Sequence, residues 1–117
     1  MLTLIRRIRE SGLPVYLLSN IGHWTLKRLL EMYDFWDMFD RRIFSCEIGM
    51  VKPEVEIYQY MLDTLQANAG ETVFIDDLAV NTAAAAKMGI RTITFQDPEQ
   101  CAAELAEVGV PRDGSTR

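Results

Sequence analysis

The stretch VFIDDLAVN, residues 73–81, decides the fold, because a short apolar run leads through two aspartates into a helix. The run at residues 72–75 predicts a strand that is buried on both faces, and the alanine-rich segment at residues 81–88 predicts a helix closed by Gly89. The same order recurs at residues 15–33, where VYLL is followed by polar residues and then by an amphipathic helix. Strands that alternate with helices in this way predict parallel βα units.

The rest of the chain continues the alternation. Pro53 is expected in the first turn of a helix, and Asp97 is expected to cap the final helix, which ends near Gly109. Strands are expected at residues 15–18, 42–46, 72–75 and 91–95, and the apolar helix positions are Leu4, Ile5, Ile8, Leu26, Leu29, Leu30, Tyr33, Val55, Tyr58, Leu62 and Leu65. This pattern predicts an open α/β structure, in which helices cover both faces of a parallel sheet and make three layers.

Composition limits the classes of function. A chain of 117 residues, 49% of them hydrophobic, can form one domain, which we place at residues 1–109 with a flexible tail at residues 110–117. Its net charge of −5 disfavours nucleic acid as a partner, and no apolar run is long enough to span a membrane. The basic N-terminal segment does not resemble a secretory signal. The two cysteines, Cys46 and Cys101, have no metal-type spacing, so we expect free thiols and a cytoplasmic location.

Polar side chains follow three of the expected strands. These are Ser19 and Asn20, then Lys52, then Asp76 and Asp77. In open parallel sheets, ligands bind beyond the carboxyl ends of the strands, so these residues are expected to lie together. A hydroxyl and an amide can donate to phosphate oxygens, a lysine can neutralise one, and paired carboxylates can hold a divalent cation. Taken singly, the same residues would be helix caps, a turn and a solvated lysine.

In type, order and spacing, the strings VYLLSN, GMVKPEVEIY and VFIDDLAVN resemble motifs two, three and four of haloacid dehalogenase-like (HAD) hydrolases. The resemblance covers residues 1–105 and is strongest to the branch of sugar-phosphate phosphatases, 2-haloacid dehalogenases and the N-terminal domain of soluble epoxide hydrolases. It implies a Rossmann-like core and a magnesium-dependent phosphatase activity. It assigns phosphate binding to Ser19, Asn20 and Lys52, catalysis to Lys52, Asp76 and Asp77, magnesium binding to Asp76 and Asp77, and a supporting role to Asn81.

The family's first motif, DxDx(T/V), is missing from this sequence. In the family its first aspartate is the nucleophile and its second is the general acid and base. We therefore expect a truncated core, which begins just before motif two and lacks the first strand and the helical cap. Such a fragment would have strongly reduced activity or none alone, and would bind magnesium weakly. A non-catalytic binding module and a remnant of gene truncation remain alternatives.

The expected partners follow from the same resemblance. An active form would act on a small phosphorylated metabolite, which the sequence does not identify. The family places its first strand between the strand that ends in motif two and the strand that ends in motif four. Its absence leaves two apolar strand edges unpaired. The two edges can pair directly with each other, or a second copy of the chain can cover them. We favour a homodimer, with or without exchanged elements.

Overall fold

The computed structural model describes residues 2–110, and its strands form two separate parallel pairs. Strand β1 (Tyr16–Ser19) pairs with β2 (Arg41–Phe44), and β3 (Val73–Asp76) pairs with β4 (Arg91–Thr94). The expected α/β fold with parallel strands is therefore confirmed. Within the described residues, however, the strands make two two-stranded sheets and not one continuous sheet.

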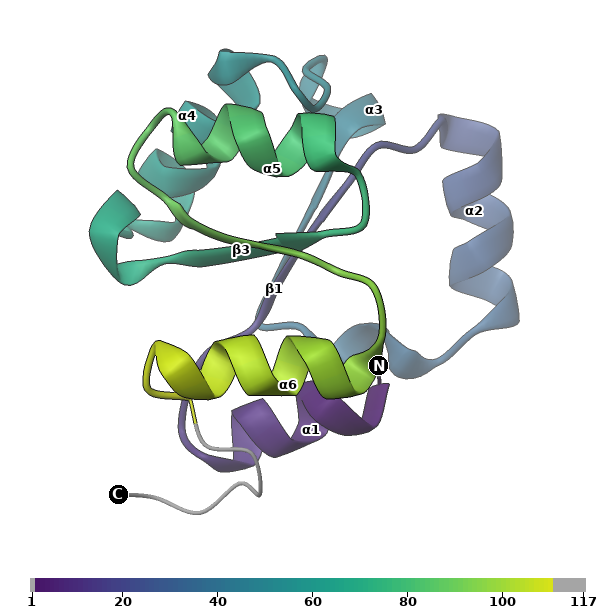
Figure 1. The fold of residues 1–117 in the computed structure, drawn as a ribbon. Coiled ribbons are helices and arrows are strands. Elements are labelled where there is room, and N and C mark those ends of the chain that lie inside the picture. The colour runs from purple at the N-terminus through teal and green to yellow at the C-terminus, as the bar shows by residue number, and fades with distance from the viewer. Residues whose placement is uncertain (1, 111–117) are drawn as a thin grey trace.

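Helices cover the strands on both sides. In Figure 1, α4 and α5 lie on one side of the strands, and α1 and α6 lie on the other, which gives the three predicted layers. The helices are α1 (Leu2–Glu10), α2 (His23–Met32), α3 (Ser45–Ile48), α4 (Val55–Leu65), α5 (Ala79–Ala86) and α6 (Pro98–Glu107), with short 3-10 helices η1 (Phe35–Met38) and η2 (Ala69–Glu71).

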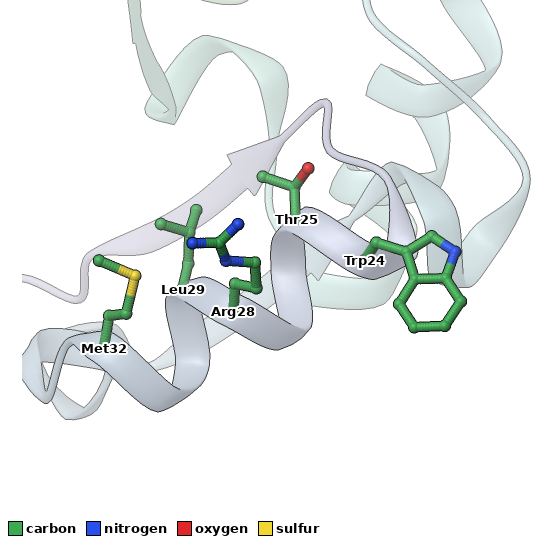
Figure 2. A pocket seen from close by; sticks show the side chains of 5 residues that line it. All are labelled: Trp24, Thr25, Arg28, Leu29 and Met32. Carbon is green, nitrogen blue, oxygen red and sulfur yellow. The ribbon is translucent and has the colours of Figure 1, made fainter.

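Helix α2 stands at the edge of the molecule (Figure 1). Leu26 is its buried residue, whereas Trp24 is 82% exposed. A shallow hollow of about 380 Å³ runs along this helix and is lined by Trp24, Thr25, Arg28, Leu29 and Met32 (Figure 2). The predicted burial of Leu30 and Tyr33 is wrong, because their side chains are 45% and 47% exposed.

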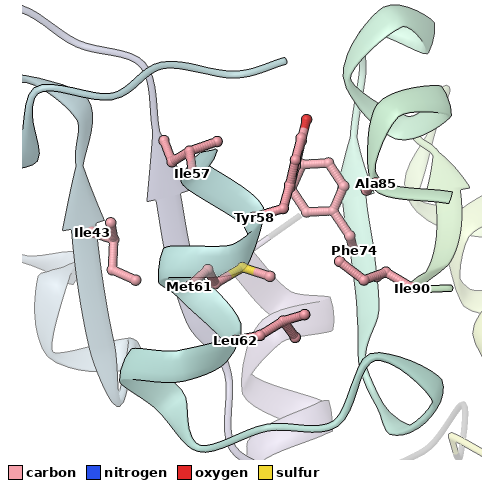
Figure 3. Packing of buried hydrophobic residues seen from close by; sticks show 8 residues of the cluster. All are labelled: Ile43, Ile57, Tyr58, Met61, Leu62, Phe74, Ala85 and Ile90. Atoms are coloured by element: carbon pink, nitrogen blue, oxygen red, sulfur yellow. The ribbon is translucent and has the colours of Figure 1, made fainter. Parts of the chain in front are cut away.

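Two hydrophobic clusters join the sheets through side chains. The first packs α4 against both sheets, and in Figure 3 Ile57 and Met61 of α4 are seen between Ile43 of β2 and Phe74 of β3. The second lies on the opposite side and contains Leu4, Ile8, Ile93, Cys101 and Leu105, with Val15, Val73 and Ile75 packed against it. The first cluster draws residues from both sheets, and the second draws on β3, β4 and Val15, the residue just before β1. The two sheets therefore share one pair of helical layers although no backbone ladder joins them within the described residues.

Two local predictions for the third helical stretch were wrong. The structure begins α4 at Val55, so Pro53 precedes the helix, because a turn closed by the hydrogen bond from Glu54 N to Val51 O occupies that position. Val55 is 56% exposed, and the buried stripe of α4 is Ile57, Tyr58, Met61 and Leu62. In contrast, the capping box at Asp97 is confirmed, since its carboxylate accepts from Gln100 N at 2.8 Å.

The strand bounds differ from the prediction by one or two residues. Ser19 and Asp76 are the last residues of their strands, because the parallel ladders extend to Ser19↔Phe44 and Asp76↔Thr94. Val110, which was placed in a flexible tail, packs against the second cluster and donates to Leu105 O at 2.9 Å. The rest of that tail, residues 111–117, lies outside the described residues. The helices of the described part are all too short or too polar to cross a membrane.

Candidate active site

Lys52 lies at the centre of the polar residues that the sequence singled out. Its Nζ donates to Asp76 Oδ2 at 2.7 Å and to the backbone oxygen of Leu18 at 3.1 Å. The side chains of Lys52 and Asp76 are only 10% and 5% exposed, so the ion pair is buried. One ammonium group thus joins the carboxyl end of β1 to the carboxyl end of β3, although the two strands do not pair.

Both carboxylate oxygens of Asp76 accept hydrogen bonds from donors of this chain. Besides Lys52, its carboxylate accepts from Leu78 N at 2.9 Å and from Asn81 Nδ2 at 3.2 Å. Burial by itself would raise the pKa of Asp76, but the hydrogen bonds from Lys52, Leu78 and Asn81 and the charge of Lys52 hold that pKa below its usual value. Asp76 is therefore an anion whose role in this structure is to fix Lys52 and the start of α5.

Asn20 and Ser45 hold the loop that follows β1. The side-chain amide of Asn20 accepts from Lys52 N at 2.9 Å and donates to Lys52 O at 2.9 Å. Ser45, buried at the start of α3, accepts from Ile21 N at 2.8 Å and donates to Ile21 O at 3.2 Å. The loop after β1 is therefore fixed by two side chains that each bond both backbone groups of one residue.

Tyr58 is a member of the site that the sequence reasoning treated only as an apolar helix position. Its ring packs edge-on against Phe74, and its hydroxyl donates to Asn81 O at 2.8 Å. Burial, and secondly the charge of Asp76, raise the pKa of Tyr58 to about 12. A tyrosine on the buried stripe of a helix needs a hydrogen-bond partner for its hydroxyl, and this need is the feature of the sequence that could have indicated a polar contact for Tyr58. Ser45 gave no comparable signal in the sequence.

Two predicted residues lie beside this cluster without joining it. Ser19 is half-buried between Leu18 and Asn20, and its hydroxyl makes no hydrogen bond within the described part of the chain. Asp77 is exposed and likewise bonds to none of the described residues. The structure therefore brings together Asn20, Lys52, Asp76 and Asn81, with Ser19 and Asp77 at the margin.

The described residues do not by themselves fit a magnesium site. They contain no group of three or more histidine, cysteine, aspartate or glutamate side chains that could hold a metal ion. Of the two predicted ligands, Asp76 accepts three hydrogen bonds on its two oxygens, whereas Asp77 bonds to none of the described residues. Magnesium favours six oxygen ligands, so one free carboxylate gives an incomplete site.

Comparison with known proteins identifies the class. The family model for haloacid dehalogenase-like hydrolases matches residues 1–89, and the chain belongs to this family. It is 33% identical over 108 residues to a sesquiterpene phosphatase of Aspergillus oryzae, which covers 92% of this chain and 55% of the relative. It is also 46% identical over 70 residues to bifunctional epoxide hydrolase 2 of Rattus norvegicus, covering 60% of this chain and 13% of that protein.

Solved structures confirm the fold and the predicted resemblance. A HAD family enzyme of Bacteroides thetaiotaomicron, crystallised with magnesium, superposes with a TM-score of 0.78 at 31% identity, covering 89% of this chain and 55% of the other. The same enzyme with magnesium and inorganic phosphate gives a TM-score of 0.75 at 32% identity, covering 83% of this chain and 52% of the other. The chain thus spans about half the length of these relatives.

Proposed function

We propose that this chain is one part of a magnesium-dependent phosphomonoester phosphatase, and that its centre works only when another polypeptide segment supplies the nucleophilic carboxylate. The observation that carries the proposal is the buried Lys52–Asp76 pair, which holds a lysine between the carboxyl ends of β1 and β3. A phosphatase of this family needs such a cation beside the phosphoryl group, because charge stabilisation and positioning supply most of the catalysis.

The charges of the cluster support the need for a further component. The charge of Lys52 is balanced by Asp76, and Asp77 adds a second negative charge at the margin. A phosphate ester therefore meets no excess positive charge from these side chains. Asp77 can contribute one oxygen to a cation, and we infer that the completing segment provides the other carboxylate ligands. The bound cation would neutralise charge on the phosphoryl group.

Strand pairing indicates what kind of segment completes the site. Within the described residues, β1 and β3 each pair with one strand only, yet the two sheets share the same helical layers. Near the end of β1 the backbone oxygen of Leu18 accepts from the side chain of Lys52. Unpaired backbone groups at this depth are costly. An added strand, apolar on both faces and ending in carboxylates, would satisfy them.

We propose a small phosphorylated metabolite with an apolar part as the substrate. Large apolar side chains stay exposed on the segments that carry the site, namely Trp24 at 82%, Val51 at 45%, Val55 at 56%, Leu78 at 55% and Val80 at 60%. A relative that matches 92% of this chain is named a sesquiterpene phosphatase, which is a property of that protein and supports the same class of ester here.

Complementation tests the proposal. The portion of the Aspergillus oryzae phosphatase outside the matched region would be added as a separate polypeptide, with magnesium and either an aryl phosphate or a sesquiterpenyl monophosphate. We expect activity from the mixture, none from either part alone, and loss of that activity in Lys52→Ala but not in the matched exposed control Lys87→Ala. A stable complex that hydrolyses neither ester would contradict the proposal.

One observation favours a non-catalytic binding module as the second candidate. Lys52 and Asp76 satisfy each other, so the described residues form a closed cluster that requires no ligand for its stability. Under this alternative, the added segment would bind and stabilise the chain, and no magnesium-dependent turnover would appear with any phosphomonoester.

A further inference from the structure

Asn20 makes a two-point contact with a single residue, Lys52. Its Oδ1 accepts from the backbone N–H of Lys52 and its Nδ2 donates to the backbone oxygen of the same residue, both at 2.9 Å. The amide therefore pairs with Lys52 as a neighbouring strand would, and it fixes the peptide groups on both sides of the Lys52 Cα. Fixing both peptide groups also fixes the direction in which the side chain leaves the backbone.

The backbone beside Asn20 is itself fixed by hydrogen bonds. Ile21, the next residue, has both of its backbone groups bonded to the buried hydroxyl of Ser45. The restraint therefore runs from α3 through Ile21 to Asn20, and from Asn20 to Lys52. A lysine side chain has four rotatable bonds, so a fixed starting direction reduces the conformational freedom that is lost when Nζ reaches Asp76.

We propose that Asn20 is a positioning residue for Lys52, which acts by holding the Lys52 backbone and not by binding phosphate. This inference does not rest on the proposed function, because it concerns where the ammonium group lies in the chain as it exists. It separates Asn20 from Ser19, whose hydroxyl stays free of the described residues and open to a ligand. The assignment predicts that loss of the Asn20 amide loosens Lys52 while the fold persists.

Lysine acetylation measured by mass spectrometry tests the proposal. The chain has three lysines, Lys27, Lys52 and Lys87, of which the first and last are exposed and serve as internal references. In wild type, Lys52 should react far more slowly than the references, because its ammonium is bonded and its side chain is 10% exposed. In Asn20→Ala, we expect Lys52 to react roughly tenfold faster than in wild type. A tenfold change corresponds to the free energy that the loss of two neutral hydrogen bonds is expected to cost.

Three controls separate positioning from general destabilisation. Asn68→Ala removes the same amide at another exposed site and should leave all three lysine rates unchanged. Alkylation of Cys101, which is 0% exposed, reports global opening and should not accelerate in Asn20→Ala. Asn20→Asp keeps the acceptor for Lys52 N–H but loses the donor, so its Lys52 rate should lie between those of wild type and Asn20→Ala.

Two results would overturn the inference. An Asn20→Ala protein whose Lys52 reacts at the wild-type rate would show that the ammonium is placed without the amide contact. A rise in the Lys52 rate that is matched by Lys27, Lys87 and the Cys101 thiol would show that Asn20 only stabilises the fold.

Discussion

Removal of the Lys52 charge is expected to destabilise the fold, because it leaves a buried carboxylate without its counter-ion. The pair is 2.7 Å apart, with side chains 10% and 5% exposed, so water does not replace the lost partner. Truncating one member of such a pair costs ~3–5 kcal/mol. Asp76 keeps the donors Leu78 N and Asn81 Nδ2, so we expect Lys52→Met at the lower end, about 3 kcal/mol.

A double-mutant cycle measures this interaction directly. Free energies of unfolding would be obtained from urea titrations at pH 7, followed by tryptophan fluorescence, for wild type, Lys52→Met, Asp76→Asn and the double mutant. We expect a coupling free energy of roughly 1.5–3 kcal/mol, the range for hydrogen bonds to charged groups. The exposed control Lys87→Met should stay within ~0.5 kcal/mol of wild type. A coupling free energy near zero would refute the conclusion that the pair is a structural centre of the site.

Three further predictions concern acid, metal and assembly. The folded protein lowers the pKa of Asp76, so the contribution of this carboxylate to stability is complete above the unfolded pKa of 3.8 and is lost as the pH falls through the lower folded pKa. Urea midpoints should therefore fall less steeply in acid for Asp76→Asn than for wild type. Equal slopes would count against Asp76 as the source of the acid sensitivity. Magnesium should bind the chain weakly, at about millimolar concentration, with NMR shifts centred on residues 76–81, and shifts centred on another cluster would contradict the assignment of Asp77. Light scattering at micromolar concentration should show a homodimer, because in the described residues β1 and β3 each pair with one strand only and their other edges expose unpaired backbone groups. A monodisperse monomer would argue against this.

The fold could be predicted because its signals are local. Buried runs such as residues 72–75, and the capping residues around Asp97, specify strands and a helix without reference to distant parts of the chain. The predictions from sequence were wrong where tertiary contacts determine the local structure or the burial of a side chain. Pro53 fits a helix by its own preferences, yet the turn between Val51 and Glu54 keeps it outside. Apolar spacing likewise could not distinguish the covered side of α2 from the uncovered side that carries Leu30.

The site was predictable in its residue types but not in its bonding. The rule that ligands bind at the carboxyl ends of strands brought Asn20, Lys52 and Asp76 together before any contact was known. Their partners could not be foreseen, because hydrogen bonds depend on loop conformation. Asn20 bonds to the Lys52 backbone, a contact that the sequence spacing does not indicate. The hydroxyl of Tyr58 donates to the backbone oxygen of Asn81, although the spacing of Tyr58 predicted only an apolar helix position.

We propose that this chain supplies the lysine and aspartate of a HAD-like centre, and that another polypeptide segment supplies the carboxylate that attacks the substrate. Hydrolysis of an activated aryl phosphate by the chain alone, with magnesium, tests it most directly, beside Lys52→Ala, Asp76→Ala and Asp77→Ala. Loss of a nucleophile removes the covalent path, so the wild-type rate should lie orders of magnitude below that of a full-length relative. A wild-type rate equal to that of a full-length phosphatase, and lost in Asp77→Ala, would contradict the claim.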